Sequence, residues 1–62
     1  MQKVLATFYL QDDYNYKYEL IQDLKTGKTF IFVHCKDTNK FFDYNVQEFE
    51  KDNNINLNDL LN

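Results

Sequence analysis

Four segments of the chain alternate apolar and polar residues with a period of two, which is the pattern of half-buried β-strands. They cover residues 3–11, 14–24, 29–35 and 40–46. The third segment is apolar on both faces, so we expect it to be a central strand.

Short polar turns separate these segments. Asp12 and Asp13 end the first, residues 25–28 follow the second, and residues 37–39 close a hairpin between the third and the fourth. Gly27 can adopt the positive φ of a tight turn. Connections this short join antiparallel neighbours, so the pattern predicts a four-stranded antiparallel sheet.

The period changes after Asn45. A short helical element is predicted around Gln47 to Lys51, with Asn45 as its N-cap and Glu48 three residues further on. Residues 55–61 fit either a short strand or a short helix that starts at Asn56 or Asn58. The predicted fold class is α+β, mostly β, as one domain over residues 1–62; a small SH3-like barrel is the alternative.

The small size of the chain limits how it can be stabilised. A domain of 62 residues has a small core and usually needs a staple or a partner. Cys35 has no second cysteine to pair with, and one Cys with His34 cannot complete a zinc site. Aromatic residues make up 18% of the chain, so aromatic packing, a homodimer or a bound partner remain as sources of stability.

Charge is distributed unevenly along the chain. The net charge is −3, and all seven cations are lysines. An acidic chain without arginine is a poor candidate for direct nucleic-acid binding. Residues 43–62 hold five acids against Lys51, which predicts either a solvated face or a surface for a basic partner.

The chain contains no apolar run long enough to span a membrane and begins without the features of a signal peptide. The lone Cys35 fits a reducing compartment. We therefore expect the protein to be cytoplasmic.

The residues that could carry catalysis are few. His34 and Cys35 are adjacent in a predicted strand, so their side chains point to opposite faces and cannot act as a pair. Asp12 and Asp13 fit turn positions, and Gly27 alone does not make a phosphate-binding loop. We expect no enzymatic activity, no cofactor and no metal site.

Three tyrosines, Tyr14, Tyr16 and Tyr18, share one face of the second segment. They fit a cover over the core or a dimer seam, and a protein interface is the alternative. Stacking of nucleic-acid bases would also need a cationic groove. Only Lys17 lies between them, and it points to the other face.

The candidate partner-binding residues lie in an acidic segment near the end of the chain; they are Phe49, Glu50, Glu48, Asp43 and Asp52. Phe49 has two interpretations. It is either the core anchor of the short helix or an exposed apolar plug ringed by carboxylates. A plug of that kind fits a site that normally binds DNA, because the carboxylates can occupy phosphate positions and steer the encounter.

Residues 7–13 (TFYLQDD), followed by Tyr16-Lys17-Tyr18, resemble the first hairpin of the small phage-encoded uracil-DNA glycosylase inhibitors. Glu48-Phe49-Glu50 is similar to the core of that family's helix, and residues 55–57 stand where its last strand lies. The match requires an inserted hairpin over roughly residues 25–44. A second alignment starts at the Phe30 strand and keeps the helix match.

The resemblance implies an acidic homodimer that mimics DNA and blocks the DNA-binding groove of the enzyme. It implies that Phe49 is the plug and Glu50 a phosphate mimic, with Asp43 a looser match. Other host nucleases are targets of the same class. The competing hypotheses are an acidic interaction or regulatory module without DNA mimicry, and a nucleic-acid binder that uses the tyrosine face.

Overall fold

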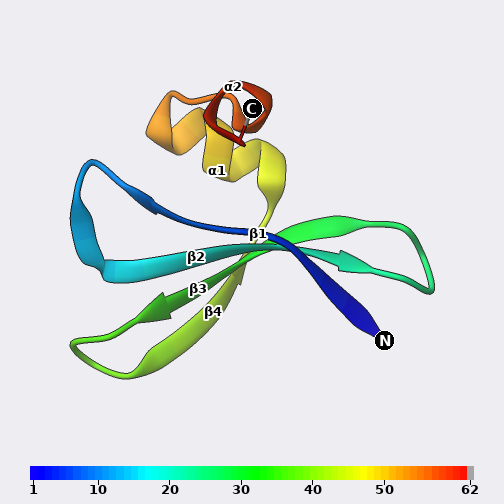
Figure 1. The fold of residues 1–62 in the computed structure, drawn as a ribbon, viewed down its shortest axis with the longest axis horizontal. Coiled ribbons are helices and arrows are strands. Elements are labelled where there is room, and N and C mark those ends of the chain that lie inside the picture. The colour runs from blue at the N-terminus through cyan, green and yellow to red at the C-terminus, as the bar shows by residue number, and fades with distance from the viewer. Residues whose placement is uncertain (62) are drawn as a thin grey trace.

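The computed structural model describes residues 1–61 and contains an antiparallel sheet followed by two short helices (Figure 1). The four strands follow one another in the order β1-β2-β3-β4. Their bounds, with those of the helices, are β1 (Gln2–Leu10), β2 (Asp13–Asp23), β3 (Thr29–Cys35), β4 (Lys40–Tyr44), α1 (Val46–Asn53) and α2 (Leu57–Leu61).

The predicted four-stranded antiparallel sheet with a C-terminal helix is confirmed. The alternative of a small SH3-like barrel is wrong, because β1 and β4 do not pair with each other and the sheet stays open. The strand bounds agree with the sequence pattern to within two residues, and β3 matches it at both ends. Asn62, the last residue of the predicted domain, lies outside the described residues.

Residues in left-handed backbone conformations form the hairpin turns. Gln11 and Asp12 have φ values of 50° and 58° in the β1–β2 turn, and Gly27 and Asn39 have values of 78° and 54° in the next two. Glycine adopts such values freely, and Asn and Asp tolerate them better than most residues do. Asp13 follows the first of these turns and begins β2, and its carboxylate accepts a hydrogen bond from the Asn15 N–H at 3.0 Å.

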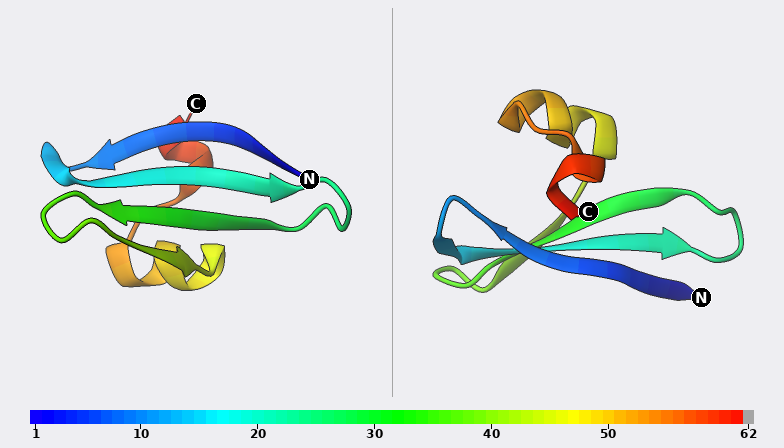
Figure 2. Two further views of the ribbon diagram at one scale, coloured as in Figure 1. Left: turned by 90° about the horizontal axis from the view of Figure 1, so that it is seen from below. Right: turned by 45° about the horizontal axis from the view of Figure 1, so that its top comes forward.

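The helices cover one face of the sheet and leave the other uncovered by any described residue (Figure 2). We call the covered side the helix face and the other the open face. The register assigns residues to each, since directly opposed residues of antiparallel strands share a face. Tyr18, Val33 and Phe42 are opposed on the helix face, whereas Phe32 and Asp43 are opposed on the open face.

The core lies between the helix face and the two helices. Its buried residues are Phe8, Ile31, Val33, Phe49 and Leu57. Phe49 is 1% exposed, and its ring centroid lies 5.3 Å from that of Tyr18, 5.5 Å from that of Tyr44 and 6.0 Å from that of Phe8. The interpretation of Phe49 as the core anchor of the helix is therefore correct.

Asparagine side chains cap both helices. The Asn45 side chain accepts the Glu48 N–H at 3.1 Å, as the sequence predicts. α1 is longer than the predicted element and ends at Asn53, followed by the C-cap residue Asn54, whose φ of 53° is left-handed. The Asn56 side chain accepts the Asn58 N–H at 2.9 Å, so residues 57–61 form a helix and the strand alternative is wrong.

Tyr44 connects β4 to α1 through a hydrogen bond that its hydroxyl donates to the Asp52 carboxylate. This hydrogen bond raises the pKa of Tyr44, with burial adding to the effect. A raised folded-state pKa means that the tyrosine stabilises the fold below its unfolded pKa of about 10. The contribution is lost as the pH rises through the folded-state pKa.

The Tyr44→Phe variant is therefore expected to be less stable than the unchanged protein at pH 7, since it lacks the hydroxyl that Asp52 accepts. The difference should shrink above a pH of about 10. Urea denaturation at neutral and alkaline pH measures both free energies of unfolding. Equal stability of the two proteins at pH 7 would contradict a stabilising role for this bond.

Candidate functional site

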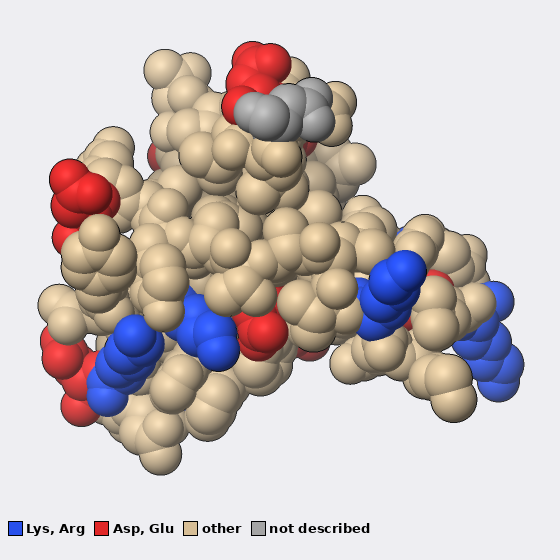
Figure 3. All heavy atoms as spheres, in the orientation of Figure 1, with Lys and Arg blue, Asp and Glu red and all other residues tan. Residues whose placement is uncertain are grey.

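The excess negative charge of the chain is confined to the helices. Between them α1 and α2 carry Glu48, Glu50, Asp52 and Asp59 against Lys51 alone, whereas the sheet and its turns hold six acids and six lysines. On the face drawn in Figure 3 the lysines lie over the sheet. We call these four carboxylates the acidic helix layer. The charge asymmetry along the sequence is therefore an asymmetry between the two layers of the fold.

Three of the five candidate partner-binding residues lie in the acidic helix layer, and they differ in freedom. Glu48 and Asp52 are exposed on α1, although Asp52 accepts the Tyr44 hydrogen bond. Glu50 is half-buried, and its carboxylate accepts the Leu57 N–H at 2.8 Å, which holds the start of α2. Glu48 is thus freer than Glu50 to meet a partner.

The interpretation of Phe49 as an exposed plug ringed by carboxylates is wrong, and Asp43 does not lie beside it. Phe49 points from α1 toward the sheet and is part of the buried core. Successive residues of a helix point about 100° apart, so Glu48 and Glu50 project to the sides while Phe49 points inward. Asp43 opposes Phe32 on the open face, on the other side of the sheet from the helices. The five residues therefore do not form one surface.

The open face carries a stacked aromatic cluster that is not among the predicted site residues. The His34 and Phe41 rings are parallel with centroids 4.2 Å apart, and Phe41 stacks on Phe32 at 5.5 Å. Phe41 is 54% exposed. The signal for this cluster is the apolar character of the third segment on both faces, because its outer face had to meet either a partner or solvent.

The tyrosine stripe has two environments. Tyr18 lies in the core, where its ring stacks on Phe8 with centroids 5.5 Å apart. Tyr14 is 61% exposed and meets Tyr9 edge to face at 5.2 Å. The prediction that the three tyrosines cover the core is therefore correct for Tyr18, whereas Tyr14, next to the β1–β2 turn, is exposed.

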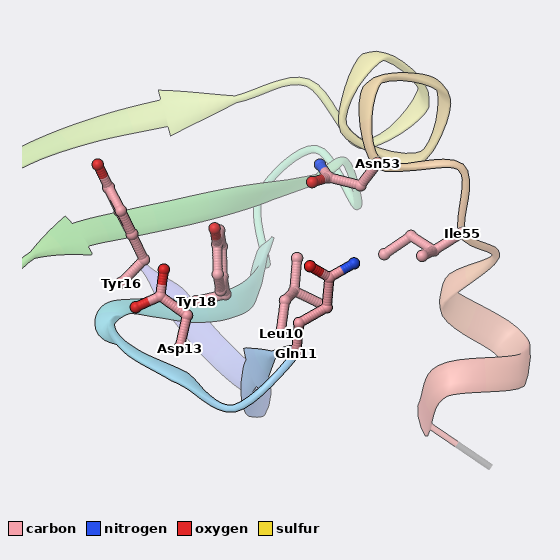
Figure 4. A pocket seen from close by; sticks show the side chains of 7 residues that line it. All are labelled: Leu10, Gln11, Asp13, Tyr16, Tyr18, Asn53 and Ile55. Carbon is pink, nitrogen blue, oxygen red and sulfur yellow. The ribbon is translucent and has the colours of Figure 1, made fainter.

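A pocket of about 230 Å³ lies between the β1–β2 hairpin and the segment that connects α1 to α2 (Figure 4). Its lining residues are Leu10, Gln11, Asp13, Tyr16, Tyr18, Asn53 and Ile55. In the close view Leu10, Gln11 and Tyr18 point toward Asn53 and Ile55. No short motif could have revealed this pocket, because its two walls are about forty residues apart in the sequence.

Electrostatic effects connect the tyrosines of the pocket to nearby groups. Burial, followed by the charge of Asp13, raises the pKa of Tyr18. The Cys35 side chain, through the negative charge of its thiolate form and a hydrogen bond, is the main cause that raises the pKa of Tyr16, and the charge of Asp13 adds to it. Both tyrosines therefore keep their protons at neutral pH and present hydroxyl groups.

His34 and Cys35 lie on opposite faces, as the strand alternation predicts. Cys35 opposes Tyr16 on the helix face and is buried, whereas His34 opposes Phe41 on the open face. Hydrogen bonds from Thr38 lower the pKa of the Cys35 thiol. Across residues 1–61, no three side chains of His, Cys, Asp or Glu come together in a metal-binding arrangement.

In the described part of the chain, neither helix has the length and apolar character needed to cross a membrane. Comparison with protein-family models, with curated proteins and with solved structures found no match to this chain.

Proposed function

We propose that this protein inhibits a DNA-processing enzyme by presenting its acidic helix layer to the enzyme's DNA-binding groove. Uracil-DNA glycosylase is the favoured target, with the protein acting as a phage counter-defence factor in the cytoplasm of the host cell. The observation that carries the proposal is the confinement of the excess negative charge to α1 and α2. The resemblance of residues 7–13 to the first hairpin of the inhibitor family supports this choice of target, whereas the plug role that the match at residues 48–50 implies for Phe49 is not kept, because Phe49 is buried.

The physical basis is charge complementarity at a surface that ordinarily holds phosphates. Carboxylates on a rigid helix replace phosphate oxygens without the cost of ordering a flexible segment. Opposite charges also increase the rate of encounter, and this effect is weakened by salt. The layer is held in place by the buried Phe49 and by the Glu50 cap at the start of α2.

Because Phe49 is buried, it does not contact the enzyme in the proposed complex. The apolar contact with the enzyme comes instead from α2, where Leu60 and Leu61 are 41% and 38% exposed beside Asp59. An apolar group with a polar rim is the usual form of a binding hot spot. The contact surface thus combines Glu48, Asp52 and Asp59 with two exposed leucines.

A second candidate function is an acidic interaction or regulatory module without DNA mimicry, including one that pairs with itself as a homodimer. The stacked cluster of Phe32, His34 and Phe41 on the open face favours it, because aromatic side chains are enriched where proteins meet. The two candidates use opposite sides of the sheet, so mutations can separate them.

Charge-neutralising variants test which side binds. The double variant Glu48→Gln/Asp59→Asn is expected to weaken inhibition of uracil excision by about tenfold at low salt, since it removes two steering charges. Asp43→Asn removes one acid from the open face, at a residue exposed like the other two. It is expected to inhibit like the unchanged protein.

A uracil-excision assay with purified bacterial uracil-DNA glycosylase measures both effects, and thermal unfolding checks that each variant is folded. If the Asp43 variant loses inhibition while the helix variant keeps it, the contact lies on the open face and the acidic helix layer is not the binding surface.

A further inference from the structure

The pocket between the β1–β2 hairpin and the α1–α2 connection, hereafter the hairpin pocket, is suited to a group of side-chain size. Its volume is about 230 Å³. Sites for drug-sized ligands occupy roughly 300–1,000 Å³, so a nucleotide or an organic cofactor would not be enclosed here. The end of one amino-acid side chain would fit a pocket of this volume.

The polar groups that line the pocket are one carboxylate, two amides and two tyrosine hydroxyls, and Asp13 is the one charged residue among them. Asp13 supplies a carboxylate, and one of its oxygens already accepts the Asn15 N–H at 3.0 Å. The Asn53 amide nitrogen donates a hydrogen bond to the Phe49 carbonyl at 2.9 Å. The amide oxygen of Asn53 takes no part in this bond and can accept one from a ligand. Gln11 adds a second amide. No lysine is among the lining residues.

The other walls are aromatic and aliphatic. Tyr16 and Tyr18 present ring surfaces next to Asp13, whose charge contributes to the raised pKa of both hydroxyls. Ring faces attract cations, and arginine stacks on them with its planar group. Leu10 and Ile55 offer apolar surface to the methylene stem of a long side chain.

We propose that the hairpin pocket binds the guanidinium group of an arginine side chain that a partner protein supplies. A guanidinium has five donors and no acceptor, which matches a lining of one carboxylate and two amides better than a neutral polar group does. Its planar group can stack on a tyrosine ring while the methylene stem of the arginine contacts Leu10 and Ile55. The origin of the arginine in a basic DNA-binding surface rests on the proposed function, but the preference for guanidinium does not.

The test is an NMR titration of the isolated protein with N-acetyl-arginine amide, followed by backbone amide shifts. N-acetyl-citrulline amide is the matched control ligand, because it has the same shape without the charge. Arginine is expected to shift the amides of Gln11, Asp13 and Asn53 with saturable, millimolar affinity, and citrulline is expected to leave them unchanged. Equal shifts with both ligands, or arginine shifts spread evenly over all the acidic residues, would overturn the proposal.

A pair of variants separates the pocket from general electrostatic attraction. Asp13→Asn keeps an acceptor for the Asn15 N–H but removes the charge, and it is expected to weaken arginine binding about tenfold. Asp12→Asn makes the same change at the neighbouring turn residue, which does not line the pocket and whose φ of 58° suits asparagine. It is expected to keep nearly full affinity. Equal weakening by both variants would show that the pocket plays no special part.

Failure of the pocket inference can be distinguished from failure of the proposed function, because the titration contains no enzyme. If arginine binds the pocket but uracil excision is not inhibited, the pocket stands and the source of the arginine is wrong. If the enzyme is inhibited but Asp13→Asn binds arginine as well as the unchanged protein does, the pocket inference alone fails.

Discussion

Replacing Phe49 with alanine is expected to leave most of the protein unfolded at room temperature. Phe49 is 1% exposed, and its ring meets the rings of Phe8, Tyr18 and Tyr44. Removal of a buried phenylalanine ring costs about 3–5 kcal/mol. The core of a domain of this size supplies roughly 3–5 kcal/mol in total, so the loss is comparable to the whole free energy of unfolding.

The matched control is Phe42→Ala, which makes the same change at a residue of β4 that is 46% exposed. It is expected to cost about 1 kcal/mol or less, since exposed positions contribute little to stability. Circular dichroism with urea denaturation measures both variants. A Phe49→Ala protein with unchanged stability and lost binding would restore Phe49 as an exposed plug and contradict the packing described here.

Replacing Leu57 with alanine is expected to lower the free energy of unfolding by about 2–3 kcal/mol, toward the low end for buried leucines because α2 is a short helix. Leu57 is 6% exposed and belongs to the core cluster with Ile31 and Phe49. It is the one buried residue of α2. Without it, the hydrogen bond from the Leu57 N–H to the Glu50 carboxylate would still join α2 to α1, but α2 would have no buried side chain in the core.

Leu60→Ala is the control within the same helix. Leu60 is 41% exposed, so the substitution is expected to change stability by about 0.5 kcal/mol or less. The same urea denaturation applies to both variants. Equal losses at Leu57 and Leu60 would mean that α2 does not pack against the sheet through Leu57.

The strands could be predicted from the sequence because each has its own local signal. Residues 29–35 are apolar on both faces and are followed by turn residues, and the structure has β3 at the same bounds. The α1 cap was also local, since Asn45 and Glu48 are three residues apart. The segment of residues 55–61 was ambiguous, because Ile55 and Leu57 alternate as in a strand, whereas Leu57, Leu60 and Leu61 have helical spacing. The Glu50 carboxylate and the burial of Leu57, both tertiary contacts, decide for the helix.

The candidate site was only partly predictable. The acidity of residues 43–62 is visible in the sequence, but the sequence does not separate Asp43 from the helix acids; the pairing of Asp43 with Phe32 does. Adjacent carboxylates around Phe49 resemble a ring when written in one line, although the helix turns them apart. The hairpin pocket joins Asp13 to Asn53 across the fold, and pairings of that kind depend on how the layers stack.

Two surfaces of the protein remain open to partners and have different chemistry. The helix layer is acidic, with exposed leucines on α2. The open face is aromatic and includes Phe41 and His34. A single small protein can therefore contact an enzyme with one layer while the other pairs with a second copy. This arrangement is compatible with both candidate functions, and the surface whose mutation abolishes binding decides between them.

The central claim is that the protein blocks a DNA-binding groove, and a titration of the purified protein into a uracil-excision assay with bacterial uracil-DNA glycosylase tests it most directly. The account predicts stoichiometric inhibition that weakens as salt is raised and is relieved by excess DNA, because salt screens the ion pairs and DNA competes for the groove. Uracil excision that proceeds unchanged at micromolar protein and low salt would contradict the account for this enzyme, and would leave the aromatic open face as the surface on which to seek a partner.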